Sequence, residues 1–208
     1  MCIRDRVRAY LISQNSYLNE AFNYSDVKTE DGITYKDHSA ERIVFAEGYL
    51  IKHNPFFNGI PFKPAKGEVI TVESADIELN NDIVNKNGFI MPVSPNVFKI
   101  GATYNWVDLT DLPTQNGLQE LNDKAGKITS ANYKVISHEA GVRPSVIDRR
   151  PVLGAHPNHK NMYVFNGLGT KGVMLAPYFA LHLADHILNN SPLNNEVNVA
   201  RFNQFFVN

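Results

Sequence analysis

A glycine-rich loop carries the clearest chemical potential in the sequence. Residues 164–173 read Val-Phe-Asn-Gly-Leu-Gly-Thr-Lys-Gly-Val, between a short apolar run and a long apolar segment of helical pattern. Glycines let a backbone approach a ligand closely, and a helix start offers unpaired N–H groups with the positive end of the helix dipole. The pattern predicts a loop that contacts an anionic or electron-rich cofactor or substrate. A glycine-rich helix cap with a packing role is the alternative.

The loop formally matches the Gly-x-Gly-x-x-Gly fingerprint of dinucleotide-binding folds. That fingerprint requires an acidic residue about 20 residues later, at the end of a second strand. Here the corresponding region is still part of the expected helix. We therefore do not expect this loop to belong to the first strand–loop–helix unit of a Rossmann fold.

Arg143 is the second candidate. It lies in the run Ala-Gly-Val-Arg-Pro-Ser, which we expect to form a short, rigid turn after a strand. The planar guanidinium matches both oxygens of a carboxylate, so capture of an anionic substrate is one interpretation. From these residues alone, a structural ion pair with Asp148 is the favoured interpretation.

Lys171 and a histidine pair complete the candidate groups. Lys171 lies inside the glycine loop, where the helix dipole disfavours a cation unless an anion is close; a solvated lysine is the alternative. His182 and His186 have the i,i+4 spacing of metal ligands, but no third ligand is evident nearby. We expect a packing or surface role for both histidines, and no metal site.

Composition sets the bounds on these candidates. The chain has 208 residues, 43% of them hydrophobic, which is enough to form a hydrophobic core. Its net charge of −1 gives no electrostatic reason to expect nucleic acid or an anionic membrane as partner. The single cysteine, Cys2, excludes an internal disulfide and a cysteine-based zinc site. No membrane span or signal peptide is expected, and the bounds point to a soluble, cytoplasmic protein of undetermined oligomeric state.

The elements that must position the candidates follow from hydrophobic periodicity. Short apolar runs bounded by turn residues predict strands, and apolar residues at spacings of three and four predict helices. We expect an antiparallel sheet in the middle of the chain, a strand buried on both faces at 43–46, and a largely buried final helix. The expected elements are a hairpin at 26–36, strands at 43–46, 68–72, 88–93, 97–104, 133–138 and 161–165, and helices at 113–130 and 172–189.

The first eight residues fit neither a good helix nor a strand. They carry three arginines and no capping signal. We interpret them as the result of truncation or as non-native residues, with a frayed basic terminus as the alternative.

Five segments, taken in order, resemble motifs in the C-terminal half of flavin-dependent amine oxidoreductases of the D-amino-acid oxidase / glycine–sarcosine oxidase superfamily. The resemblance covers about residues 30–190, and the order of the motifs makes it specific although each is weak alone. The segments are 43–48, ending in Ala-x-Gly; 61–68, Pro-x-x-Pro-x-x-Gly-Glu; 88–92 with 100–103, the paired substrate-domain strands; 141–154, Gly-x-Arg-Pro with Asp148, Pro151 and Gly154; and 167–177, the closing glycine loop and helix.

The resemblance implies roles for individual residues. Arg143 would bind the substrate carboxylate with help from Lys171, and Tyr104 would lie over the flavin ring. Phe89 stands where a tyrosine often binds the carboxylate, and Glu47 replaces a usual small residue. The implied FAD contacts are Gly48, Gly167, Leu168, Gly169, Thr170, Lys171, Gly172 and Val173. No catalytic side chain is implied, because the flavin takes a hydride and the protein positions the substrate.

The resemblance also implies a mixed α+β and α/β fold. An antiparallel substrate-binding sheet would be inserted into the remnant of a Rossmann-like FAD-binding domain, with boundaries at 1–48, 49–137 and 138–208. The strand, true Gly-x-Gly-x-x-Gly and acidic ribose ligand with which the superfamily begins are not in this sequence. We therefore expect a fragment that is inactive alone and does not bind FAD tightly.

The implied function of the parent protein is oxidation of the C–N bond of a small amino or imino acid. Two alternatives stay open. The same fold could act on an aminomethyl group of a modified tRNA base, for which a basic surface would be expected. A non-catalytic domain could use Arg143 to bind a carboxylate without redox chemistry.

Overall fold

The computed structural model describes residues 3–30 and 32–206, and the chain divides into two compact units, Met1–Glu41 and Arg42–Asn208. The lone thiol of Cys2 lies outside the described residues. None of the helices in the described ranges has the length and apolar character needed to cross a bilayer.

The first unit contains one helix and a small antiparallel sheet. The predicted hairpin is confirmed, since Val27 pairs with Tyr35 and Lys28 with Thr34. The expectation of no helix at the N-terminus is wrong, because α1 spans Ile3–Ser13; arginine is a strong helix former, and this outweighs the missing cap. The elements are α1 (Ile3–Ser13), η1 (Tyr24–Asp26), β1 (Val27–Lys28), β2 (Ile33–Tyr35) and β3 (His38–Ala40).

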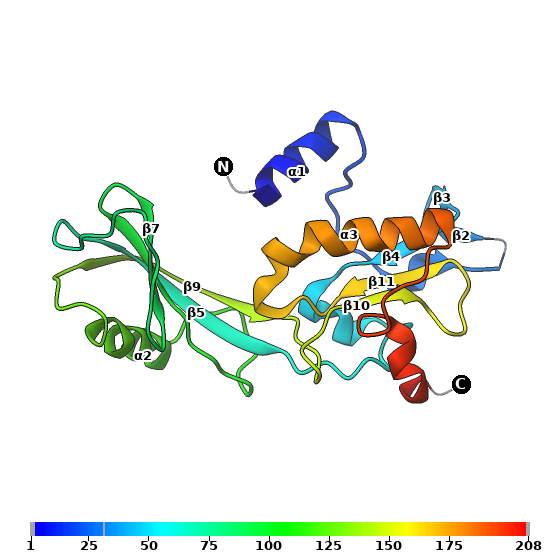
Figure 1. Cartoon of the computed structure of the whole chain (residues 1–208). Helices are drawn as coiled ribbons and strands as arrows, with labels where there is room; N and C mark the ends of the chain where they lie inside the picture. The colour runs from blue at the N-terminus through cyan, green and yellow to red at the C-terminus, as the bar shows by residue number, and fades with distance from the viewer. Residues whose placement is uncertain (1–2, 31, 207–208) are drawn as a thin grey trace. The chain divides into compact units, whose positions relative to one another are not determined.

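A five-stranded antiparallel sheet in the second unit confirms the expected β-rich centre. Its strand order is β6-β7-β8-β5-β9 (Figure 1). The long central strand β5 pairs with β8 on one side and with β9 on the other. The strands are β5 (Ala65–Glu73), β6 (Val84–Asn85), β7 (Phe89–Ser94), β8 (Val97–Gly101) and β9 (Lys134–Arg143).

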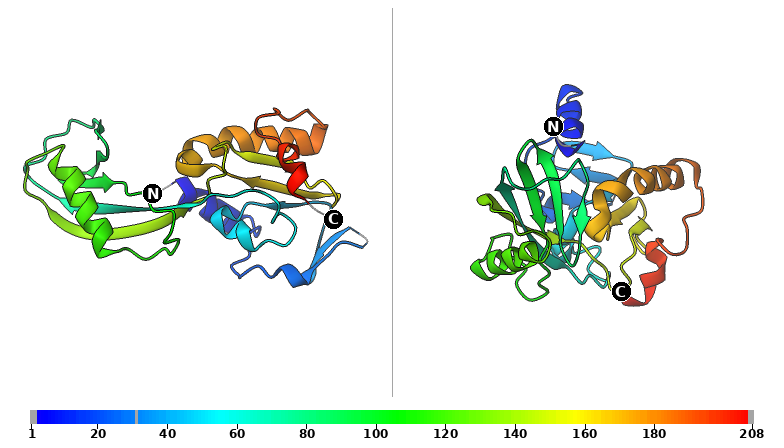
Figure 2. Two further views of the ribbon diagram at one scale, coloured as in Figure 1. Left: turned by 90° about the horizontal axis from the view of Figure 1, so that it is seen from below. Right: turned by 60° about the vertical axis from the view of Figure 1, so that its left-hand side comes forward.

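Helix α2 (Gln115–Gly126) covers one face of this sheet, as Figure 2 shows. The helix begins after Thr114, whose hydroxyl accepts a hydrogen bond from the Gly117 N–H, a typical N-cap. Leu121 of α2 packs with Ile70 and Ile100 of the sheet in a core of fully buried aliphatic side chains. Because side chains alternate along a strand, the opposite face of β5 is left open for other contacts.

A three-stranded sheet of order β10-β11-β4 forms the second half of this unit. β4 (Ile43–Phe45) runs parallel to β11 (Met162–Asn166), and β10 (Val152–Ala155) pairs antiparallel with β11. β10 was not predicted from the sequence. Helix α3 (Gly172–Asn189) lies over this sheet (Figure 1), and Leu183 of the helix packs with Leu153 of β10 in the core. The remaining short helices are η2 (Gly48–His53), η3 (Gly169–Lys171) and η4 (Val199–Phe205).

Two expectations about burial are wrong. β4 is the last strand of its sheet in the described chain, and Val44 is exposed, so the strand is not buried on both faces. Helix α3 buries only Leu183 fully, because its sheet covers a single face of the helix. The large apolar residues exposed on α3 are Val173, Met174, Tyr178, Leu181 and Leu188.

We expect Ile70→Ala to lower the free energy of unfolding by about 2–5 kcal/mol, because it opens a cavity under α2. Ile83→Ala makes the same chemical change at an exposed position and should change it by less than about 0.5 kcal/mol. Urea unfolding followed by far-UV circular dichroism measures both values. Equal losses in the two variants would contradict the assignment of this core.

Candidate functional site

Arg143 is the last residue of β9, where it pairs with Ala65 of β5. The expectation of a turn is therefore wrong at this residue: the ladder with β5 extends the strand to Arg143. Its guanidinium lies flat against Gly67, since a Cβ added to that glycine would lie 1.9 Å from Nη2. Nη1 donates to the carbonyl oxygens of Lys66 at 3.1 Å and Thr103 at 3.2 Å.

Tyr104 lies directly beside this guanidinium. The Cζ atom of Arg143 is 4.1 Å from the centroid of the Tyr104 ring, which is a cation–π distance. The Tyr104 ring is half exposed, and Trp106 lies next to it with 5.9 Å between ring centroids. The structure thus brings two predicted residues, Arg143 and Tyr104, into one site with an aromatic neighbour that the sequence did not single out.

No carboxylate of the described chain forms an ion pair with Arg143. The predicted partner, Asp148, instead pairs with Arg201 at 2.8 Å, so that interpretation is wrong. Burial lowers the pKa of Arg143, while the nearby Tyr104 acts weakly in the opposite direction. An arginine stays protonated in proteins, and a partly buried cation without a counter-ion favours an incoming anion.

The glycine loop lies at the carboxyl ends of two parallel strands. β4 leads to Gly48 and β11 leads to Gly167, and the Asn166 side-chain amide donates to the Gly48 carbonyl at 2.9 Å. Gly48, Gly167 and Gly169 have φ values of +60°, +72° and +56°, which favour glycine. Ligands of open α/β sheets bind outside the carboxyl ends of such strands.

The loop then enters α3 through the short helix η3. Lys171 occupies the N-cap position of α3, and no side chain caps the first N–H groups of the helix there. Lys171 is exposed and makes no ion pair within the described residues. The Gly169 N–H donates to the Pro144 carbonyl at 3.3 Å, which places the loop beside the residue that follows Arg143.

The Phe89 side chain lies on the same face of the sheet as the Arg143 side chain, but over a different part of strand β5. Its ring covers Gly101, since a Cβ added there would lie 2.7 Å from Phe89 Cζ. Gly101 pairs with Val69, two residues along β5 from Gly67, against which the Arg143 guanidinium lies, a separation of about 7 Å along the strand. Among the described residues, Arg143 makes its cation–π contact with Tyr104 and none with Phe89.

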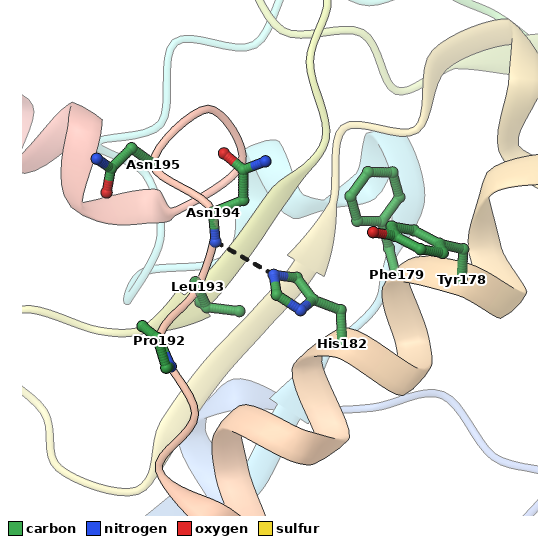
Figure 3. A pocket seen from close by; sticks show the side chains of 7 residues that line it. All are labelled: Tyr178, Phe179, His182, Pro192, Leu193, Asn194 and Asn195. Atoms are coloured by element: carbon green, nitrogen blue, oxygen red, sulfur yellow. Dashed lines mark hydrogen bonds between the residues drawn. The ribbon is translucent and has the colours of Figure 1, made fainter.

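The predicted histidine pair has a packing role. His182 accepts a hydrogen bond from the Asn194 N–H at 3.2 Å, and His186 Nδ1 lies 2.8 Å from the Ser191 carbonyl. Among the residues described, no group of His, Cys, Asp or Glu could hold a metal ion. His182 also lines a cavity of about 610 Å³ between α3 and the segment after it (Figure 3). The other lining residues are Tyr178, Phe179, Pro192, Leu193, Asn194 and Asn195.

A buried charged cluster behind the site was missed from the sequence. Lys66 and Glu68 both point to the α2 face of β5, with 0% and 4% of their surface exposed. Lys66 bonds Asp108, and this interaction with the bonds from Thr110 lowers the pKa of Asp108 from 3.8 to about 2. The alternation Ala-Lys-Gly-Glu-Val-Ile places these two charges on the face that also buries Ile70, and that was the available signal.

Comparison with known proteins identifies the family of this chain and supports its fold. Residues 17–186 match the family described as FAD dependent oxidoreductase, and the chain belongs to that family. The family is FAD-dependent. The mixed fold with antiparallel sheets, as expected from the sequence, is similar to those of glycine oxidase and proline dehydrogenase structures.

Two relatives show how similar the sequences are and how much of each protein the match covers. Glycine oxidase of Bacillus subtilis is 29% identical over 165 residues, covering 78% of this chain and 44% of its own. The bifunctional protein MnmC of Idiomarina loihiensis, of tRNA 5-methylaminomethyl-2-thiouridine biosynthesis, is 29% identical over 194 residues, covering 84% of this chain and 32% of its own.

Solved structures show the same arrangement. Glycine oxidase from Geobacillus kaustophilus has a TM-score of 0.69 and 26% identity, over 85% of this chain and 50% of its own. L-proline dehydrogenase from P. horikoshii has a TM-score of 0.74 at 18% identity, over 86% of this chain and 53% of its own. The chain thus spans about half the length of the relatives it matches, or less.

The residues present fit part of a bound flavin. Gly48 has no atom within 4 Å of the position that a Cβ would occupy, so space is open at the end of β4. The start of α3, three residues after Gly169, has no side-chain cap, so its first N–H groups are candidate donors to a ligand. Open space and backbone donors suit an electron-rich ring edge.

We expect Gly67→Ala to displace the Arg143 guanidinium, because the new methyl group would occupy its place. Loss of the bonds to Thr103 should lower the free energy of unfolding by about 1–3 kcal/mol. Gly141→Ala is the matched control, since Gly141 faces Gly67 across the ladder and has open space at its Cβ position. Urea unfolding compares the two, and equal stability of both variants would contradict the close packing.

Proposed function

We propose that this segment supplies the substrate-carboxylate site and the closing flavin loop of an FAD-dependent enzyme that oxidises the C–N bond of a small amino or imino acid. The observation that carries the proposal is Arg143, a partly buried cation that no described carboxylate neutralises. Membership in an FAD-dependent family and similarity to glycine oxidases support the redox chemistry.

In the proposed site, Arg143 binds both carboxylate oxygens of the substrate. Its orientation is fixed by hydrogen bonds to the carbonyls of Lys66 and Thr103 and by the cation–π contact with the Tyr104 ring. A rigid carboxylate anchor holds the α-carbon of the substrate in a fixed position, which lowers the entropic part of the barrier. Bound FAD would supply the hydride acceptor. Lys171 and Phe89 are proposed to line the same site.

The cofactor side of the proposal rests on the backbone of the glycine loop. The residues proposed to contact the flavin are Gly48, Gly167, Leu168, Gly169, Thr170, Lys171, Gly172 and Val173. We further propose the division 1–48, 49–137 and 138–208, in which the first and last segments belong to the FAD-binding domain.

The 208 residues alone are proposed to lack activity and tight FAD binding, since they contain no opening Gly-x-Gly-x-x-Gly strand. A purified yellow protein with one FAD per chain would contradict this part of the proposal.

An aminomethyl group on a modified tRNA base is the second candidate substrate. The MnmC relatives favour it, because their match to this chain is as extensive as that of the glycine oxidases. The net charge of −1 argues against it, since binding to tRNA depends on a basic surface. We place the small amino or imino acid first for this reason.

A protein of the family's length that carries this segment tests the proposal. Under anaerobic conditions, glycine and other small amino acids should reduce its flavin in a stopped-flow experiment. Arg143→Ala should lower kcat/KM about 10²–10³-fold, because two charge-assisted hydrogen bonds to the carboxylate are lost.

Arg149→Ala is the control, since Arg149 is exposed and follows closely in the chain. Reduction by a modified tRNA but by no free amino acid would favour the second candidate. Carboxylate binding without flavin reduction by any amine would favour a non-catalytic domain.

A further inference from the structure

Lys66 is a fully buried cation on the side of β5 that faces away from Arg143. Its side chain is 0% exposed, and its ammonium donates to Asp108, to the Thr110 hydroxyl at 3.2 Å and to the Leu112 carbonyl. An ammonium that is removed from water is tolerated only where its donors find acceptors of this kind. All three acceptors therefore have to stay close to Lys66.

These acceptors all belong to one loop, residues 102–114, between β8 and α2. The backbone of Lys66 holds the same loop a second time: its N–H donates to the Asn105 carbonyl at 2.8 Å, and its carbonyl accepts from the Asn105 N–H at 3.0 Å. Lys66 thus binds this loop by main-chain and side-chain contacts together.

Glu68 holds the C-terminal end of the loop, and its negative charge partly neutralises the buried ammonium of Lys66. One of its carboxylate oxygens lies 3.8 Å from the Lys66 ammonium. The carboxylate accepts from the N–H and the hydroxyl of Thr114, both at 2.8 Å. His138 Nε2 lies 2.8 Å from Glu68 but without the alignment of a hydrogen bond.

The loop and Lys66 together define where Arg143 lies. Thr103 of the loop supplies a carbonyl to both terminal nitrogens of the guanidinium, and Tyr104 supplies the ring beside it. Lys66 itself contributes a third contact through its carbonyl. If the loop moved, Arg143 would lose most of its partners.

We propose that Lys66 is a positioning residue for the substrate site: its buried ammonium orders the loop 102–114, and the ordered loop holds Arg143 and Tyr104 in place for the carboxylate. The inference rests on the proposed function for the role of Arg143 as a carboxylate anchor. The ordering of the loop by Lys66 is independent of that role.

Trp106 makes the test direct, because it is the only tryptophan of the chain and lies in this loop. The 208-residue protein is used with Lys66→Met, which removes the charge at similar length, and Lys66→Arg, which keeps it. Lys63→Met is the matched control, since Lys63 is exposed three residues earlier. Asp108→Asn breaks the ion pair from the loop side and leaves the sheet untouched, should Lys66→Met fail to fold.

Time-resolved fluorescence anisotropy of Trp106 is the first readout. We expect the amplitude of its fast local motion to rise at least twofold in Lys66→Met and in Asp108→Asn. Lys66→Arg should restore a value near wild type, and Lys63→Met should leave it unchanged. Far-UV circular dichroism verifies that each variant keeps its secondary structure. A wild-type amplitude in folded Asp108→Asn and Lys66→Met would overturn the proposal.

Titration with acetate, followed by Trp106 emission, is the second readout. Where wild type binds acetate, Lys66→Met should weaken the binding at least tenfold without any change to Arg143 itself. Equal acetate affinity in wild type and Lys66→Met would overturn the positioning of Arg143. Absence of acetate binding in wild type, with the anisotropy result as expected, would contradict the proposed carboxylate role of Arg143 and leave the loop ordering supported.

Discussion

The candidate site depends on one constraint: Lys66 of strand β5 has a buried ammonium that must keep its hydrogen-bond acceptors. A strand presents successive side chains to opposite faces, and β5 uses both faces. Lys66 and Glu68 point under α2, where they hold the loop that follows β8. Between them Gly67 points to the open face, where its missing side chain leaves space for Arg143. The core of the sheet and the proposed anion site are therefore built from adjacent residues.

The same arrangement connects the proposed substrate site to the loop proposed to contact the cofactor. Arg143 ends β9, and the next residue, Pro144, accepts a hydrogen bond from Gly169 of the glycine loop. The glycine loop in turn is linked to the end of β4 through Asn166 and Gly48. A carboxylate on Arg143 and a flavin at the glycine loop would consequently lie near each other, as transfer between them requires.

The sequence alone predicted the structural features that depend on local residue patterns. Alternating and 3.6-residue periodicity located most strands and both long helices of the second unit, and the glycine loop was found from its spacing. The partners of charged residues were not predictable in this way. Asp148 was assigned to the nearby Arg143, whereas its partner is Arg201, 53 residues away. Lys66 was overlooked because a charged side chain usually marks an exposed face, and only the fold shows that it is buried.

A crystal structure of a family-length protein that carries this segment, with a carboxylate substrate analogue bound, tests the central claim most directly. The account predicts that both carboxylate oxygens lie about 2.7–2.9 Å from the guanidinium nitrogens of Arg143, with the Tyr104 ring still beside it. A carboxylate held by other residues, with Arg143 bonded only to the carbonyls of Lys66 and Thr103 as it is here, would contradict it.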